Sequence, residues 1–524
     1  MTNSNSVSPS LAALDARGWN VLDRRSAPLP TQFPRLVVQT GDSFQSRGAY
    51  NVTASAVVAQ SDLVTITAAN HGQFAGGLAT LSGAKESCFE GIFPVLKIIS
   101  TSQFQVRCPG SGNLTATGTT QVINNHSARD LNALEMANAM LGHPFTVLRN
   151  AGKPGKKIED VWRGIFRDVL ALGPHAVDLS AGINNVQACA AGQEAAELVV
   201  MKTYFSRIVD ACVGKGAQLW AHTISPLGAA HGSYSTARVE LLLEFNAWLA
   251  REYSAFADPG IILINDFSVC VDPLSAIGAW KAGYSSDDIH GNATARQKVA
   301  ILQSTVIAKN YFSQSPKISS IADNYGVNAA NPNVIVNPLF TVAGGSLGTA
   351  GAGAGVATNT SHPAQWTGTW TRAGAGTVTS QLVPRADGLG NNIRYTCNPA
   401  DAGDQISILS NAMAARVSLG DILAAGCNFS ISSIAAVSNV FFCIDWSDAD
   451  GTYTQPCAMI TGSDGQLTTD FNWWLRTLPF KLITTPLTFR VRATVAFSGA
   501  AAGVVVEIGC VDLDKHPGLA ADDI

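Results

Sequence analysis

Between residues 126 and 313 the chain alternates short apolar runs with longer amphipathic stretches, and this alternation constrains its fold most strongly. Strands are predicted at FTVLRN, AVDLSAG, QLWAHTIS and GIILINDFS. Helices are predicted at ARDLNALEMANAMLG, KIEDVWRGIFRDVLALG, GQEAAELVVMKTYFSRIVDACVGKG, STARVELLLEFNAWLAREYSAF and ATARQKVAILQSTVIAKNYF. Neighbouring parallel strands need a long crossover connection, which a helix supplies. The pattern therefore predicts an α/β domain with a parallel sheet and helices on both faces, and RLVVQT supplies its first strand.

Two other segments have the alternation of β-branched and polar residues, with Gly-rich turns, that is typical of β-structure. The first interrupts the α/β pattern directly after its first strand, and the second follows it as a β-sandwich for carbohydrate binding or oligomerisation. The predicted organisation is an N-terminal arm (1–32), an α/β domain in two pieces (33–50 and 126–313), an inserted all-β module (51–125), a linker (314–335) and the C-terminal sandwich (336–524).

The charge pattern excludes several classes of partner. Only 14% of residues are charged, the formal net charge is −4, and no run of Lys or Arg occurs, so we expect no nucleic-acid partner. No apolar run reaches the ~18 residues of a membrane span, so we expect no membrane partner. The N-terminal sequence lacks a basic segment followed by an apolar one, which predicts synthesis in the cytoplasm without an export signal.

The ten Cys are scattered, without a CxxC pair or zinc-ligand spacing. We expect small buried hydrophobes, no metal and no cofactor. A disulfide between Cys88 and Cys108 is an alternative that a reducing compartment disfavours.

Four groups of polar or glycine residues stand where strands end or helices begin. Gly41-Asp42-Ser43 follows the first strand, a loop containing Gly155 follows the second, and Asn184 follows the third. Asp287 and His290 lie just before the last helix. Because the carboxyl ends of parallel strands share one edge of a sheet, where ligands bind, these groups are expected to converge.

Their chemistry is that of nucleophilic catalysis. A serine hydroxyl needs an adjacent base, so Ser43 is the candidate nucleophile and His290 the candidate acid–base catalyst. Asp287 can orient the imidazole and stabilise its charged form. Oxyanion donors would be the backbone N–H groups of Ser43 and Gly155 and the side-chain amide of Asn184. The alternative is that each residue only caps a turn or helix, which would leave a related but inactive protein.

The order of these blocks resembles that of the SGNH/GDSL hydrolase (esterase) family over residues 33–50 and 126–313. The resemblance implies a flavodoxin-like three-layer α/β/α fold, with Ser43, Gly155, Asn184 and His290 as the four residues of the family name and Asp287 completing the triad. Two positions depart from the family pattern. Asn185 replaces an Asp, for which we expect altered local hydrogen bonds only, and Phe44 replaces a Leu.

Other candidates carry weaker signals. Gly344-Gly345-Ser346-Leu347-Gly348 matches the G-x-S-x-G spacing, but it has no following helix and is interpreted as a flexible turn. His222 and His231 flank a strand end and could line the rim of a pocket, or be plain loop histidines. On the predicted second helix, Trp162 and Phe166 are expected in the core.

Four tryptophans of the C-terminal segment could stack on sugars, although core or subunit-interface positions are the alternative. They are Trp366, Trp370, Trp473 and Trp474, of which the last two, with His222, are the candidate substrate contacts.

The inserted segment also resembles a module of phage tail and other virion proteins. The matching pieces are Asn70-His71-Gly72, Leu81-Ser82-Gly83, Phe89-Glu90-Gly91 and Ser102-Gln103-Phe104. By analogy, this implies a phage tailspike or tail-fibre protein, a homotrimer that contacts other virion proteins and deacetylates host surface polysaccharide. Alternatives are a free bacterial esterase or lipase with accessory domains, and a receptor-binding virion protein whose hydrolase fold only binds sugar.

Overall fold

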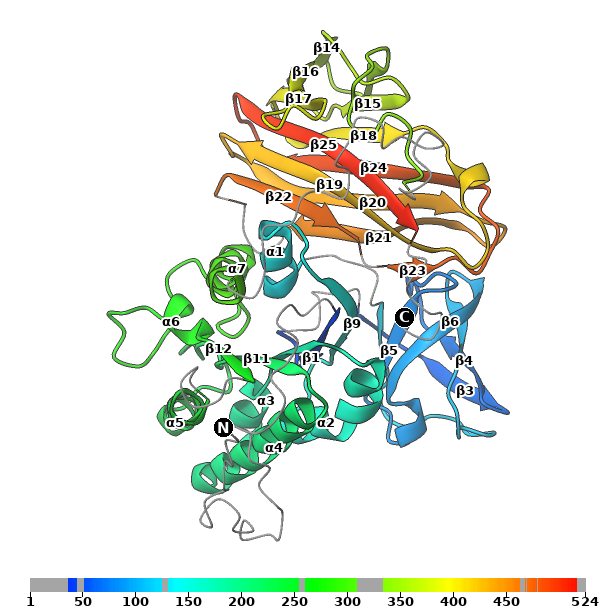
Figure 1. Ribbon diagram of the computed structural model, residues 1–524. Helices are drawn as coiled ribbons and strands as arrows, with labels where there is room; N and C mark the ends of the chain where they lie inside the picture. The colour runs from blue at the N-terminus through cyan, green and yellow to red at the C-terminus, as the bar shows by residue number, and fades with distance from the viewer. Residues whose placement is uncertain are drawn as a thin grey trace, which may run out of the picture.

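The computed structural model describes residues 36–44, 51–124, 131–253, 260–308, 333–461, 467, 469–477 and 479–515. The predicted N-terminal arm and most of the predicted linker lie outside these residues. Three parts follow one another in space: a C-terminal β-sandwich, an α/β domain below it, and a small β-module beside both (Figure 1). No helix among the described residues is long and apolar enough to cross a membrane.

The α/β domain contains the predicted parallel sheet. Its strands are β1 (Leu36–Gly41), β9 (Thr146–Gly152), β10 (Ala176–Ser180), β11 (Gln218–His222) and β12 (Ile261–Ile264). They lie in the order β12-β11-β10-β1-β9, and every neighbouring pair is parallel. When the five strands are numbered by their order in the chain, they lie across the sheet in the order 2-1-3-4-5. This is the flavodoxin-like order. The strands are buried on both faces, as expected for a covered parallel sheet.

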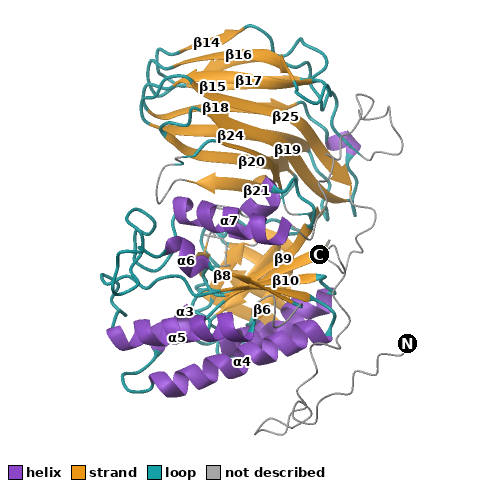
Figure 2. Cartoon of the chain, turned by 60° about the vertical axis from the view of Figure 1, so that its left-hand side comes forward, coloured by secondary structure: helices purple, strands orange, loops and turns teal. Residues whose placement is uncertain are grey.

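Helices cover both faces of this sheet and complete three layers (Figure 2). One face carries α1 (Ala133–Met140), α6 (Asp266–Cys270) and α7 (Ala293–Ala308); the other carries α2 (Ile158–Gly164), α3 (Ile183–Ala188), α4 (Glu194–Gly214) and α5 (Thr236–Glu252). The N-terminal caps of α1 and α5 are residues of types that favour this position. Asn132 and Glu135 form a capping box at α1, and Ser235 accepts the Arg238 N–H at the start of α5.

Three local predictions need correction. The predicted second helix is α-helical only to Gly164, and it continues as a π-helical turn (Ile165–Val169) and a 3₁₀ turn (Leu170–Leu172). The strand predicted as GIILINDFS ends at Ile264, because Asn265 accepts the Ser268 N–H and caps α6. Phe166 is 50% exposed rather than in the core, whereas Trp162 is partly buried.

The inserted segment forms one antiparallel seven-stranded sheet, in the order β2-β8-β5-β6-β7-β4-β3. Its strands are β2 (Asn51–Thr53), β3 (Ala56–Gln60), β4 (Leu63–Thr67), β5 (Leu78–Ser82), β6 (Gly91–Ser100), β7 (Gln103–Arg107) and β8 (Gln121–Asn124), with a 3₁₀ turn at Ser87–Phe89. The cysteines whose side chains the structure describes are free thiols, Cys88 and Cys108 included.

The C-terminal part is a sandwich of two sheets around one aromatic core. The first contains β13 (Ser346–Ala350), β15 (Trp366–Thr371), β18 (Ala402–Ser410), β24 (Thr488–Ser498), β20 (Val437–Ser447) and β21 (Thr452–Thr461). The second contains β14 (Val356–Asn359), β16 (Thr377–Pro384), β17 (Asn391–Asn398), β25 (Val504–Lys515), β19 (Ile422–Ser432) and β22 (Phe471–Arg476), and β23 (Phe480–Lys481) pairs with β19. A 3₁₀ turn spans Ala414–Arg416.

The segment Gly344-Gly345-Ser346-Leu347-Gly348 is not a flexible turn throughout, because its last three residues begin strand β13. Strand β13 pairs in parallel with β15, so the backbone of this segment is ordered by the sheet.

The three parts share apolar contacts. Helices α1 and α7 lie between the parallel sheet and the sandwich, and Met136 and Ala300 belong to the same buried cluster as the sandwich interior (Figures 1 and 2). Phe74 of the inserted module is fully buried and packs edge-on against Trp446 and Phe480 of the sandwich. Leu78 and Ile92 of the same module belong to the α/β core. The module therefore joins the other two parts.

Candidate active site

The turn after β1 is tied to both neighbouring strands. The Asp42 N–H donates to the Ser180 carbonyl at 3.0 Å, and the Lys153 N–H donates to the Gly41 carbonyl at 3.0 Å. Gly41 has φ +143°, and a Cβ there would lie 1.8 Å from the Ser180 oxygen. Only glycine fits this conformation and this close approach. The turn thus places Ser43 at the carboxyl edge of the sheet, beside the strand-order reversal where such folds bind ligands.

Ser43, His290 and Asp287 form a continuous hydrogen-bonded relay. Ser43 Oγ lies 2.8 Å from His290 Nε2, and His290 Nδ1 lies 2.7 Å from Asp287 Oδ2. The other carboxylate oxygen of Asp287 accepts the backbone N–H groups of Ile289 and His290 at 3.0 and 2.7 Å. Residues 247 positions apart therefore meet in the arrangement that a nucleophile, a base and an orienting acid require.

The charge on Asp287 is favoured by its surroundings. Partial burial raises the pKa of its carboxyl, but the hydrogen bonds from His290 and Ile289 outweigh burial and hold this pKa below the usual value. Asp287 therefore stays ionised and can face a protonated imidazole.

The two predicted oxyanion loops contact each other at the carboxyl edge of the sheet. Gly155 has φ +74°, a conformation that favours glycine, and it is exposed on the loop between β9 and α2. Asn184 lies in the first turn of α3 and donates one amide hydrogen to the Lys156 carbonyl at 3.0 Å. Since a side-chain amide has two hydrogens, the other can serve a substrate oxygen.

The departure at Asn185 has a visible structural role. Asn185 is fully buried, and its oxygen accepts the Ile158 N–H at 2.9 Å. Its amide donates to Glu159 and Glu197 at 2.9 and 2.7 Å. An amide can both accept and donate here, whereas an ionised Asp would face two other carboxylates. The residue therefore joins α3 to α2 and α4.

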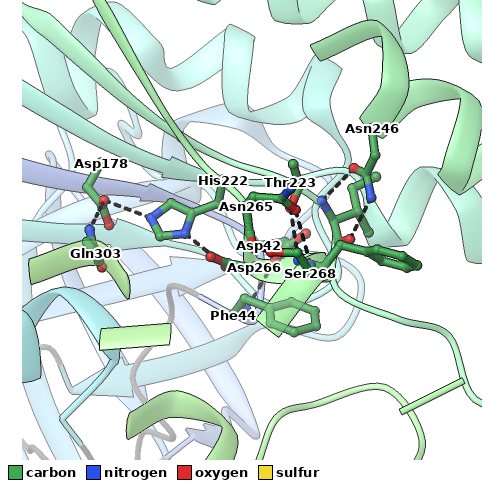
Figure 3. A network of polar contacts seen from close by, with 12 residues as sticks. Asp42, Phe44, Asp178, His222, Thr223, Asn246, Asn265, Asp266, Ser268 and Gln303 are labelled. Atoms are coloured by element: carbon green, nitrogen blue, oxygen red, sulfur yellow. Dashed lines mark hydrogen bonds and ion pairs between the residues drawn. The ribbon is translucent and has the colours of Figure 1, made fainter. Parts of the chain in front are cut away.

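His222 lies inside the domain and not at a pocket rim, so it is not placed to contact a substrate. Its side chain is 2% exposed, and its ring lies between two carboxylates, with Nδ1 2.8 Å from Asp266 and Nε2 3.0 Å from Asp178 (Figure 3). Burial lowers the pKa of His222, but the two carboxylates outweigh burial and raise it to about 10. Gln303 of α7 donates to Asp178 at 2.7 Å, so this charged group joins two strands to α6 and α7.

The other weak candidates are also placed by the structure. His231 is a partly buried loop residue whose Nδ1 accepts the Ser233 N–H at 3.1 Å. Trp366, Trp370 and Trp473 are buried in the sandwich core, which excludes a sugar contact at these residues in the described structure. Trp474 is partly buried and packs against a small cluster on Leu339 and Cys510.

Two features beside Ser43 were missed by sequence reasoning. Asp42 is 1% exposed, and burial raises the pKa of its carboxyl to about 7, although the Phe44 N–H at 3.0 Å and the nearby His290 lower it. The Phe44 ring lies 5.4 Å from the His290 ring, centroid to centroid, and covers part of the imidazole. The sequence did hold a signal for Asp42, because a carboxyl residue stands there between a buried apolar strand and the candidate nucleophile.

No group of three or more His, Cys, Asp or Glu side chains in the described part of the chain could hold a metal ion.

No protein-family model and no curated protein matches the sequence. Several solved structures are similar over part of the chain. A GDSL-like lipase from Bacteroides thetaiotaomicron shares 18% identity over 30% of this chain and 72% of its own, with a TM-score of 0.24. A variant of an acetyl-xylooligosaccharide esterase from Geobacillus shares 12% over 54% of this chain and 100% of its own, with a TM-score of 0.31.

The enzymatically active domain of tailspike protein 4 from bacteriophage CBA120 shares 13% identity over 29% of this chain and 20% of its own, with a TM-score of 0.22. Esterases and acylhydrolases thus recur among the structural neighbours. At such low TM-scores these likenesses carry no argument about the activity, which depends on the geometry around Ser43.

Proposed function

We propose that the chain is a serine esterase of the SGNH/GDSL type that removes acetyl groups from a polysaccharide. The observation that carries this proposal is the chain of contacts from Ser43 through His290 to Asp287, at 2.8 and 2.7 Å. The loop that contains Gly155 is tied to the turn before Ser43 through the Lys153 N–H and to Asn184 through the Lys156 carbonyl. Residues that only capped turns would not need to meet in this order.

The geometry supports an acyl-enzyme mechanism. Ser43 Oγ attacks the ester carbonyl carbon while its proton passes to His290 Nε2. The resulting oxyanion receives hydrogen bonds from the Ser43 and Gly155 N–H groups and the Asn184 amide. When the tetrahedral intermediate collapses, the C–O bond to the alcohol breaks and His290 returns the proton to that oxygen. A water molecule, deprotonated by His290, then attacks the acyl carbon; as the bond from that carbon to Ser43 Oγ breaks, His290 returns the proton to Ser43 Oγ and the acid leaves. Asp287 stabilises the imidazolium in both halves.

The proposed setting is a phage particle. An inserted module that resembles virion modules and a C-terminal sandwich both support a tailspike or tail-fibre protein. Such a protein would be a homotrimer, would bind other tail proteins, and would deacetylate host surface polysaccharide. Detection of the chain in purified virions, and sedimentation at the mass of three chains, are the expected results.

The catalytic proposal is tested by acetate release from a chromogenic acetyl ester and from acetylated host polysaccharide. Ser43→Ala is expected to lower kcat at least about a thousand-fold, since members of such a relay act as a unit. Ser304→Ala, at a partly buried serine on α7 whose side chain bonds only its own helix in the described contacts, is the matched control and keeps wild-type turnover. A fluorophosphonate should label the wild type and the control but not Ser43→Ala. Equal turnover in wild type and Ser43→Ala would remove the proposal.

A further inference from the structure

The inserted module touches the loop that carries Gly155. Glu90, which directly precedes β6, lies with its Oε2 3.2 Å from Lys156 Nζ. The two side chains are only 19% and 24% exposed, so this ion pair is partly shielded from water. Lys156 is the neighbour of Gly155 in the chain, and it is the residue whose carbonyl receives the Asn184 amide. One residue thus connects the module to both predicted oxyanion loops.

The same loop is held at its other end by the nucleophile turn and by the π-helical turn that follows α2. The Lys153 N–H donates to the Gly41 carbonyl, and the Lys156 N–H donates to the Lys153 carbonyl at 3.3 Å, which closes a turn around Gly155. Lys153 Nζ lies 2.8 Å from the buried carboxylate of Asp168. Lys153 thus fixes one end of the turn, and Glu90 contacts its other end at Lys156.

Glu90 itself is held firmly enough to act as an anchor. Its other carboxylate oxygen accepts the Gly83 N–H within the module. The following residues dock on the α/β domain. Ile92 is 8% exposed in the α/β core, and the Arg167 guanidinium lies 3.1 Å from where a Cβ on Gly91 would stand. Arg167 is in turn paired with Asp168 at 2.7 Å. The carboxylate of Glu90 therefore has a defined place relative to the sheet.

We propose that Glu90 is a positioning residue for the oxyanion site, and that the inserted module acts on the active site through the Glu90–Lys156 ion pair. This inference rests on the proposed esterase function. Donors that are already in place stabilise a developing oxyanion without reorganising during the reaction. Holding Lys156 restricts the turn that presents the Gly155 N–H, and it keeps the Lys156 carbonyl where it orients Asn184. The pair should therefore affect the chemical step more than the binding of substrate.

The test is a double-mutant cycle in the full chain, with Glu90→Gln, Lys156→Met and both together, assayed on a chromogenic acetyl ester. Each single variant is expected to lower kcat about five-fold, with KM changed less than about two-fold, as for a partly shielded ion pair. The double variant should lose no more than either single variant, because both remove one interaction. Glu86→Gln is the matched control, since the Glu86 side chain bonds only Thr117 of the module in the described contacts. It should keep wild-type kcat.

A second readout separates positioning from folding. Affinity for an alkyl boronic acid, which forms a tetrahedral anion on a serine, should fall in both variants in parallel with kcat, while the midpoint of thermal unfolding stays at the wild-type value. Unchanged kcat in both single variants, or losses that multiply in the double variant, would overturn the inference while leaving the esterase proposal intact. No hydrolysis by the wild type would instead remove the proposed function, and this inference with it.

Discussion

The carboxyl group of Asp42 offers a sharp test of the environment beside the nucleophile. It is 1% exposed, and burial raises its pKa from 3.8 to about 7 against the opposing hydrogen bond from Phe44. Between these two pH values the unfolded chain has lost the proton while the folded chain keeps it. The folded state therefore binds more protons in this window, and its stability falls as the pH rises.

The magnitude follows from the same shift. Between these two pKa values the free energy of unfolding falls by about 1.4 kcal/mol for each pH unit. Above pH 7 it is therefore about 4 kcal/mol lower than in acid, where the carboxyl is protonated in both states. Asp42→Asn keeps an oxygen that can accept the Phe44 N–H and removes the charge. The two proteins can differ in stability by an amount that does not depend on pH. Between pH 4 and pH 7, however, the free energy of unfolding of the variant should rise by about 4 kcal/mol relative to that of the wild type.

The measurement is urea unfolding of both proteins at several pH values between about pH 4 and pH 9. The difference in unfolding free energy should rise from acid to neutral pH and then stay level. Ser304→Ala, which removes no ionisable group, is the control and should run parallel to wild type. Curves for Asp42→Asn and wild type that are parallel throughout would refute the argument that burial controls this carboxyl.

Three further substitutions test the site and its support. Asp287→Asn should lower kcat by about 10²–10⁴-fold with little change in KM, because the imidazole loses the partner that orients it; wild-type kcat would contradict the relay. Gly41→Ala should destabilise the chain by about 2–4 kcal/mol in urea unfolding, since its Cβ would meet the Ser180 oxygen at 1.8 Å. A loss under about 0.5 kcal/mol would show that the strand end yields easily. Phe74→Ala should remove about 3–5 kcal/mol by leaving a cavity against Trp446 and Phe480, and an unchanged unfolding curve would argue against the contact between module and sandwich.

Much of the α/β domain could be predicted because its signals are local. Continuous apolar strands between amphipathic helices indicated a parallel sheet, and the order β12-β11-β10-β1-β9 agrees with that prediction. The edge where parallel strands end brought Ser43 and His290 to 2.8 Å, as the motif order suggested. Predictions failed where a distant contact overrides local pattern. The predicted second helix changes to a π-helical turn at Ile165, next to a buried Asp168 that Lys153 holds.

The sequence by itself determined which residue types stand at the strand ends, because motif order and hydrophobic period are properties of neighbouring residues. Only the tertiary structure decided their surroundings, since burial and charge depend on segments that are far apart in the chain. His222 reads as a loop histidine until Asp178 and Asp266, each 44 residues away, enclose it. Glu90 reads as a turn residue of a small module until the fold brings it within 3.2 Å of Lys156.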